Sequence, residues 1–181
     1  HNNYDSSTRW SDVDGVVELD ATPGDDTFNS SSANLSIPPE SQVQWAGLYW
    51  SGNQKNVMGA TITNSSAPRD QVLLRGPGGT YVQIDDVWCA TIGNNFVCYA
   101  DVTNLVRTQG PGSYTVANLS TNTGEDDFIG GWELNAVFAN DALPLKSVTI
   151  FHGHQNYGDT LEQTFLFEGF LPPLMGPVET L

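Results

Sequence analysis

Two cysteines nine residues apart, Cys89 and Cys98, constrain the fold more than any other feature of the sequence. They lie in residues 87–102, where apolar and β-prone residues flank the short polar centre Gly93-Asn94. This pattern predicts two strands joined by a two-residue type II′ turn, with the glycine supplying the positive φ. In that register Cys89 lies opposite Cys98 at a non-hydrogen-bonded position, which is close enough for a disulfide. We therefore expect a covalently closed hairpin.

The same register predicts two further cross-strand pairs. Trp88 lies opposite Tyr99 as an aromatic pair on the other face of the hairpin, and Asp86 lies opposite Asp101 near its open end. Two facing carboxylates repel unless a cation or water lies between them, so Asp86 and Asp101 form a candidate metal site. The alternative is that the strands have splayed at this point and both carboxylates are solvated.

Strand signals recur along the rest of the chain without a sustained helical period. Alternation of apolar and polar residues, bounded by turn residues, predicts eight strands, over residues 27–39, 44–51, 71–75, 81–84, 113–119, 132–139, 147–151 and 163–170. We further expect an edge strand in residues 13–19, a short strand in 60–63 and one helical turn in 102–110. About nine or ten strands predict an all-β, antiparallel, jelly-roll-like β-sandwich. We divide the chain into an acidic segment, residues 1–26, that acts as a donor or edge strand, and a sandwich domain, residues 27–181.

Residues 44–51 combine aromatic and small residues without a charge, as expected of a central strand. Period-2 geometry places Trp45 and Tyr49 on one face and Leu48 and Trp50 on the other. Core packing is one interpretation of these rings. The other is a sugar-stacking platform made of Trp45, Tyr49 and Trp50.

Charge excludes one class of partner. The chain has 6 Lys and Arg against 21 Asp and Glu, a formal net charge of −15. Because no basic surface is available to displace counterions from phosphates, nucleic acid is not an expected partner. The acidic excess instead favours cations such as calcium. No run of about 18 apolar residues occurs, so we expect no membrane span, and two cysteines at hairpin spacing indicate an oxidising, extracellular location.

Further candidate metal ligands lie in two places. Glu125, Asp126 and Asp127 form the densest acidic turn and are candidate calcium ligands. His152 and His154 would share one face of a strand, a spacing that can chelate a metal, although two exposed histidines at a strand end are an equally simple interpretation.

Catalysis has little support in the sequence. No Gly-x-Ser-x-Gly motif occurs, and bridged cysteines cannot act as nucleophiles. Carboxylates are abundant, but no spacing singles out a hydrolytic pair. We therefore expect no enzymatic activity. Four Asn-x-Ser/Thr sequons, at Asn29, Asn34, Asn64 and Asn118, permit glycosylation.

Several motifs together resemble one family. The chain is similar to the N-terminal β-rich domain of large secreted bacterial surface proteins that carry conserved repeat domains. The resemblance covers Thr27 to about Val178 and rests on these stretches: Thr27-Phe28-Asn29-Ser30-Ser31-Ser32-Ala33, Leu35-Ser36-Ile37-Pro38-Pro39, Trp45-Ala46-Gly47-Leu48-Tyr49-Trp50-Ser51-Gly52, Leu74-Arg75-Gly76-Pro77-Gly78-Gly79, Ala100-Asp101-Val102-Thr103, Gly112-Ser113-Tyr114-Thr115-Val116-Ala117-Asn118, Gly131-Trp132-Glu133-Leu134 and Leu143-Pro144-Leu145-Lys146-Ser147-Val148-Thr149-Ile150-Phe151.

The resemblance implies an exported, adhesin-like protein of the cell surface with no catalytic residues to transfer. His152 and His154 depart from the family pattern, so a histidine site would be particular to this chain. The family domain continues past Leu181, which implies a chain that is truncated, processed or completed by a neighbour's strand. We expect a structural or adhesive module that associates with itself or with other cell-surface proteins, as a fibre subunit joined by strand exchange. The alternative is a calcium-dependent carbohydrate-binding module whose partners are glycans.

Overall fold

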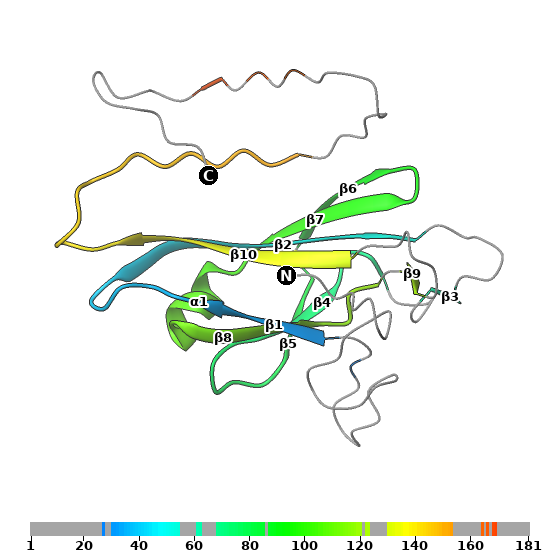
Figure 1. Ribbon diagram of the computed structural model, residues 1–181, viewed down its shortest axis with the longest axis horizontal. Coiled ribbons are helices and arrows are strands. Elements are labelled where there is room, and N and C mark those ends of the chain that lie inside the picture. Colours follow the sequence, from blue (N-terminus) through cyan, green and yellow to red (C-terminus); the bar gives the residue numbers. More distant parts are fainter. Residues whose placement is uncertain are drawn as a thin grey trace.

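The strands form two antiparallel four-stranded sheets that pack face to face (Figure 1). The computed structural model describes residues 27, 30–54, 61–62, 68–85, 87–120, 122–123, 130–153, 164, 166, 168 and 169. Residues 1–26 therefore lie outside the described part of the chain, and their role as a donor or edge strand stays a prediction.

The first sheet has the order β1-β8-β4-β5 and the second the order β10-β2-β7-β6. The strands of the first sheet are β1 (Ser30–Leu35), β4 (Val72–Arg75), β5 (Val82–Ile84) and β8 (Gly112–Ala117). Those of the second are β2 (Gln42–Asn53), β6 (Val87–Ile92), β7 (Asn95–Asp101) and β10 (Gly130–Ala139). Helix α1 (Thr103–Gln109) connects β7 to β8, and the two-residue strands β3 (Thr61–Ile62) and β9 (Asn122–Thr123) pair separately.

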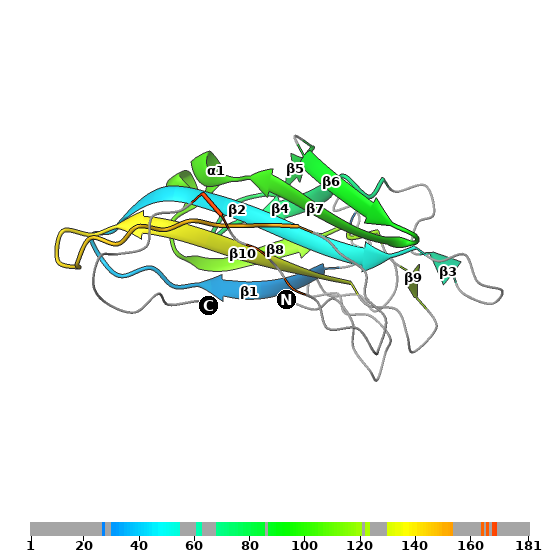
Figure 2. The same cartoon turned by 90° about the horizontal axis from the view of Figure 1, so that it is seen from above.

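The predicted all-β antiparallel sandwich is confirmed, with eight strands in its two sheets instead of nine or ten. One predicted strand is wrong, because residues 147–151 are extended but belong to neither sheet. The chain reverses at Asn140, where the Leu143 amide donates to the Asn140 carbonyl at 3.0 Å. It then runs over the outer face of the second sheet, not beside the edge of β10 (Figure 2). Of residues 163–170, those that are described are not in a strand.

The β6–β7 hairpin has the predicted turn, register and disulfide. Gly93 has φ 62°, and Cys89 faces Cys98 across the two strands. Their sulfur atoms are bonded, and the Cα atoms are 4.2 Å apart. The register also pairs Trp88 with Tyr99, as predicted. The disulfide ties β6, an edge strand that among the described strands pairs with β7 alone, to the interior of the sheet.

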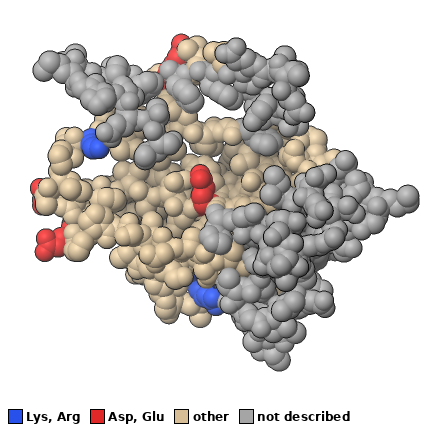
Figure 3. Space-filling model, in the orientation of Figure 1, with Lys and Arg blue, Asp and Glu red and all other residues tan. Residues whose placement is uncertain are grey.

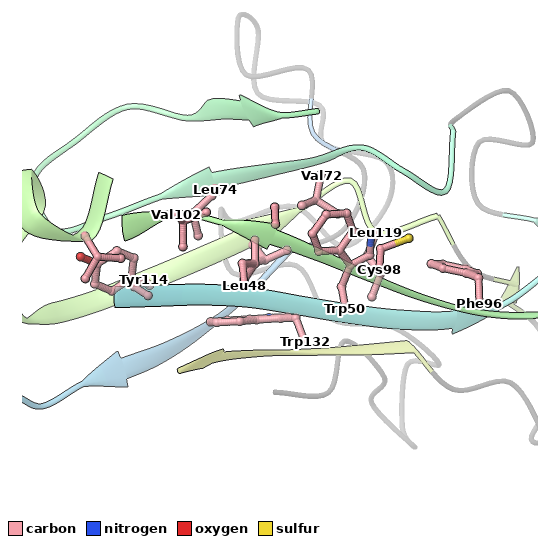
Figure 4. Close-up of a cluster of buried hydrophobic side chains, with 14 residues drawn as sticks. Leu48, Trp50, Val72, Leu74, Phe96, Cys98, Val102, Tyr114, Leu119 and Trp132 are labelled. Carbon is pink, nitrogen blue, oxygen red and sulfur yellow. The ribbon is translucent and has the colours of Figure 1, made fainter. Parts of the chain in front are cut away.

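The core lies between the sheets and is filled by alternate residues of their strands (Figure 4). β2 contributes Ala46, Leu48 and Trp50, and the other strands and the segments around α1 contribute Val72, Leu74, Phe96, Cys98, Ala100, Val102, Val106, Tyr114, Val116, Leu119 and Trp132. Period-2 alternation explains why these residues point inward while their sequence neighbours point outward. The buried Tyr114 hydroxyl donates to the Gly110 carbonyl at 2.7 Å, and burial raises the pKa of Tyr114 to about 12.

Hydrogen bonds join the second sheet to β1 and to α1. The indole Nε1 of Trp132 in β10 donates to Ser31 Oγ in β1 at 2.8 Å. The buried backbone amide of Ala46 in β2 donates to Thr103 Oγ1 at 2.9 Å. Asp101 Oδ1 accepts from the Thr103 amide at 2.8 Å, which satisfies one of the free N–H groups of the first helical turn.

Candidate functional site on the outer face of the second sheet

Aromatic side chains cover the middle of the outer face of the second sheet. Because Leu48 and Trp50 point into the core, Trp45 and Tyr49 of β2 point outward. Register places Tyr49 beside Tyr99 of β7, and Tyr99 beside Trp88 of β6. The Tyr49 and Tyr99 rings are 5.0 Å apart between centroids. The result is a row of rings across three adjacent strands. We call Trp45, Tyr49, Tyr99 and Trp88 together the aromatic face.

Gly47 allows two of these rings to lie close to the backbone. A Cβ atom at this position would lie 2.5 Å from Cη2 of Trp45 and 2.9 Å from Cε2 of Tyr99. The two rings have near-parallel planes, 19° apart, with centroids separated by 6.3 Å. The absence of a side chain at Gly47 therefore makes room for both rings above β2.

The chain crosses the aromatic face again after β10. We call residues 144–153 the crossing segment; Figures 1 and 2 show it above β10 and β2 as a separate layer. The His152 ring lies 5.0 Å from the Trp88 ring, 5.1 Å from Tyr99 and 6.0 Å from Tyr49, measured between centroids. His152 thus occupies the centre of the aromatic face.

The outer faces of the two sheets differ in chemistry. On the first sheet, Ser32 Oγ and Thr115 Oγ1 share a hydrogen bond of 2.8 Å, and Thr115 Oγ1 also accepts from an Arg75 guanidinium nitrogen at 3.5 Å. These groups are polar, although Thr115 is only 4% exposed and Ala117, which points to the same side of β8, is fully buried. The second sheet instead presents aromatic rings outward, with Trp88 46% exposed.

Two exposed carboxylates, of Glu133 and Asp101, lie beside the aromatic face. Burial, and to a lesser degree the neighbouring Tyr99 and Glu133, raise the pKa of Tyr49 above its ordinary value. In the view of Figure 3 the described surface shows only isolated acidic and basic groups. Seven of the 21 acidic residues of the sequence fall in the described ranges, so most of the negative charge is carried by other parts of the chain.

The three candidate sugar-stacking residues lie in different environments in the structure. Trp50 is 1% exposed in the core and cannot stack on a ligand, while its indole Nε1 donates to the Arg69 carbonyl at 2.9 Å. Trp45 and Tyr49 lie half-buried on the aromatic face. Core packing therefore holds for Trp50, and sugar stacking by Trp45 and Tyr49 stays a prediction.

The candidate metal ligands are only partly described. Asp101 is exposed and accepts from the Thr103 amide at the start of α1, while Asp86 and the acidic turn Glu125, Asp126 and Asp127 fall in the undescribed part of the chain. Within the described ranges, no three His, Cys, Asp or Glu side chains come together as a metal site. These calcium sites stay predictions.

Of the two candidate metal-binding histidines, the structure describes one. His152 is exposed, as one of the two interpretations expected, and it also packs against aromatic rings, which the sequence did not predict. His154 is not among the described residues, so a metal site with both histidines stays untested.

Two of the four sequons can be placed. Asn34 is exposed on β1. Asn118 has φ 63°, and Ser120 of the same sequon is 1% exposed, so this sequon is less accessible in the folded chain. Asn29 and Asn64 are outside the ranges that the structure describes.

The sequence indicated the parts of this site but not their assembly. The Trp88–Tyr99 pair and the outward direction of Trp45 and Tyr49 follow from alternation. Contacts between residues more than 40 positions apart in the sequence decide the rest. They place β7 next to β2, bring the Tyr99 ring over Gly47 and position His152. No local pattern carries that information.

Two hollows lie away from the aromatic face. One, of about 650 Å³, lies between the β1–β2 connection and α1, where Arg107 donates to the carbonyls of Val43 and Gln44 at 2.7 and 2.8 Å. The other, of about 570 Å³, lies beside residues 76–79 on the first sheet. Among the described residues, no helix is both long and apolar enough to cross a membrane.

Comparisons with models of protein families, with curated proteins and with solved structures found no match for this chain.

Proposed function

We propose that the protein is an extracellular structural or adhesive module of a bacterial cell-surface assembly, and that it associates through the aromatic face. The observation that carries the proposal is the contrast between the two outer faces of the sandwich. The first turns hydroxyl groups and the Arg75 guanidinium outward, with Thr115 only 4% exposed, whereas the other exposes Trp88 and brings Trp45, Tyr49 and Tyr99 to the surface beside it. Aromatic residues are enriched at protein interfaces, and contiguous apolar surface on a soluble protein marks an interaction site.

Two further observations support an extracellular setting. The Cys89–Cys98 disulfide closes an edge hairpin, and stable disulfides belong to oxidising compartments. The resemblance to secreted bacterial surface proteins points the same way. The acidic charge of the chain suits a surface that must stay soluble between contacts.

Self-association through the aromatic face is tested with two variants of equal exposure. Trp88 on the second sheet and Val82 on the first are each 46% exposed. Trp88→Gln should weaken self-association at least about tenfold, because tryptophan anchors dominate interface energies. Val82→Gln should leave it unchanged. Sedimentation velocity over a range of protein concentrations, with electron microscopy of the same samples, measures both. Equal effects of the two variants would refute a role for the aromatic face.

Gly47 offers a second probe that leaves the core intact. Gly47→Ala places a methyl group against the far ends of the Trp45 and Tyr99 rings, so the rings must shift outward. We expect altered association with little change in far-UV circular dichroism.

A carbohydrate-binding module is the second candidate function. The near-parallel Trp45 and Tyr99 rings above Gly47 favour it, because flat aromatic surfaces stack on pyranose rings. The Tyr49 hydroxyl would add a polar contact, and calcium held by Asp86 and Asp101 would make binding calcium-dependent. Screening immobilised glycans with and without calcium tests this function. Loss of glycan binding in Trp45→Ala would favour it over self-association.

A further inference from the structure

We propose that the crossing segment docks onto the aromatic face of a second copy of this chain, so that two copies exchange the segment. The proposal rests on the proposed function and names the partner of the same face. It begins from the composition of the segment. Residues 144–153 contain Val148, Thr149, Ile150 and Phe151 in sequence and a single formal charge, at Lys146. This run has high β-propensity and suits an extended strand that binds another surface.

In the structure, the apolar side chains of the crossing segment remain in contact with water. Leu145 is 102% exposed, Val148 56%, Phe151 45% and Ile150 41%. His152 holds the segment to its own aromatic face through three ring contacts. Because Leu145 and Val148 keep more than half of their surface exposed, these two side chains lose little burial when the segment leaves its own face.

The structure also identifies what fits the aromatic face. The crossing segment is seated on this face, and its His152 lies among the rings of Tyr49, Tyr99 and Trp88. An identical segment from a second copy brings the same histidine to the same rings. Charge complementarity supports this partner, because the sheet presents exposed Glu133 and Asp101 whereas the segment carries Lys146.

The segment starts from a fixed point, which allows exchange without disturbing the sandwich. Asn140 donates to the Pro39 carbonyl and to Ser41 Oγ, each at 2.9 Å, and its Oδ1 accepts from the Ala142 amide at 2.9 Å. The turn is therefore anchored to the β1–β2 connection, and only the chain beyond it has to change direction. Reciprocal exchange between two copies gives a two-fold symmetric, closed dimer.

Charge substitutions in the full chain test the exchange. Val148→Glu introduces a carboxylate into the segment at an exposed position, and Val82→Glu introduces the same charge at a comparably exposed position on the first sheet. We expect Val148→Glu to weaken dimer formation at least about tenfold in sedimentation velocity and Val82→Glu to leave it unchanged. Both variants should melt at the wild-type temperature, because neither position is in the core.

A mixing experiment then separates exchange from contact within one copy. Val148→Glu has a defective segment and an intact face, whereas Trp88→Gln has an intact segment and a defective face. Each variant alone should dimerise weakly. In a mixed dimer, the intact segment of the Trp88→Gln chain can bind the intact aromatic face of the Val148→Glu chain. Native mass spectrometry, in which the two variants differ in mass, should therefore show more heterodimer than the 1:2:1 distribution that random pairing of equal amounts gives.

The outcomes distinguish this inference from the function on which it rests. If wild type and Val148→Glu associate equally while Trp88→Gln does not, or if mixing gives no excess of heterodimer, the exchange is overturned and association through the aromatic face is retained. A wild-type chain that stays monomeric at all concentrations and binds no surface protein overturns both.

Discussion

Reduction of the Cys89–Cys98 disulfide should destabilise the protein by a predictable amount. Among the described strands, β6 pairs with β7 alone and forms the edge of the second sheet. Cys89 is exposed whereas Cys98 is fully buried, so a reductant can attack the Cys89 sulfur at the surface. Reduction frees the hairpin in the unfolded chain while both sulfur atoms stay in place, which isolates the effect of the cross-link.

The magnitude follows from the length of the closed loop. The cysteines are separated by 9 positions, and a loop of about 10 residues gives about 3 kcal/mol at 25 °C from loop-closure entropy. For a domain of this size, about 1 kcal/mol shifts the melting temperature by roughly 2–4 °C. Reduction should therefore lower the melting temperature by about 6–12 °C.

Differential scanning calorimetry with and without a reductant measures this shift, and alkylation followed by mass spectrometry confirms that both thiols are free. The variant Cys89→Ala/Cys98→Ala serves as the control, because its melting temperature should not respond to the reductant. Hydrogen exchange should rise first in residues 87–92. An unchanged melting temperature in the fully reduced protein would refute the loop-closure reasoning and show that strand pairing alone holds the hairpin.

Three further predictions follow from buried polar groups. Thr103→Val removes the hydroxyl that accepts from the buried Ala46 amide and should cost about 1–3 kcal/mol in urea unfolding, whereas Thr103→Ser should restore most of that loss. Ser31→Ala removes the acceptor for the Trp132 indole and should lower the free energy of unfolding by about 1–2 kcal/mol, with a matching change in tryptophan fluorescence. An unaltered unfolding curve would contradict the hydrogen bond between the sheets. Burial raises the pKa of Tyr114 to about 12, above its ordinary value of about 10. Its neutral form therefore stabilises the fold fully below about pH 10, and this stability is lost as the pH rises towards 12. Tyr114→Phe should abolish that decline in unfolding free energy.

Much of the fold follows from local patterns. The spacing of Cys89, Gly93 and Cys98 determined the turn, register and disulfide of one hairpin, because a two-residue loop leaves a single pairing. Alternation in residues 44–51 correctly predicted that Leu48 and Trp50 point to the same side of the strand, which is the core side. These features involve residues that are close in sequence or related by the period of a strand.

The error over residues 147–151 has the opposite origin. Val148, Thr149 and Ile150 have strong β-propensity, and the prediction of a strand assumed that such residues join a sheet. Whether they do so depends on where the preceding turn directs the chain. Asn140 anchors that turn to the β1–β2 connection, and the chain then passes above the sheet.

By itself, the sequence determined the all-β class, the disulfide hairpin, the acidic charge and the inward and outward residues of the central strand. Only the tertiary structure decided that Trp45, Tyr49, Tyr99 and Trp88 share one face and that His152 lies among them. The physical reason is that side-chain direction within a strand is set by backbone period, whereas the neighbours of a strand are set by how whole sheets bury their apolar surface.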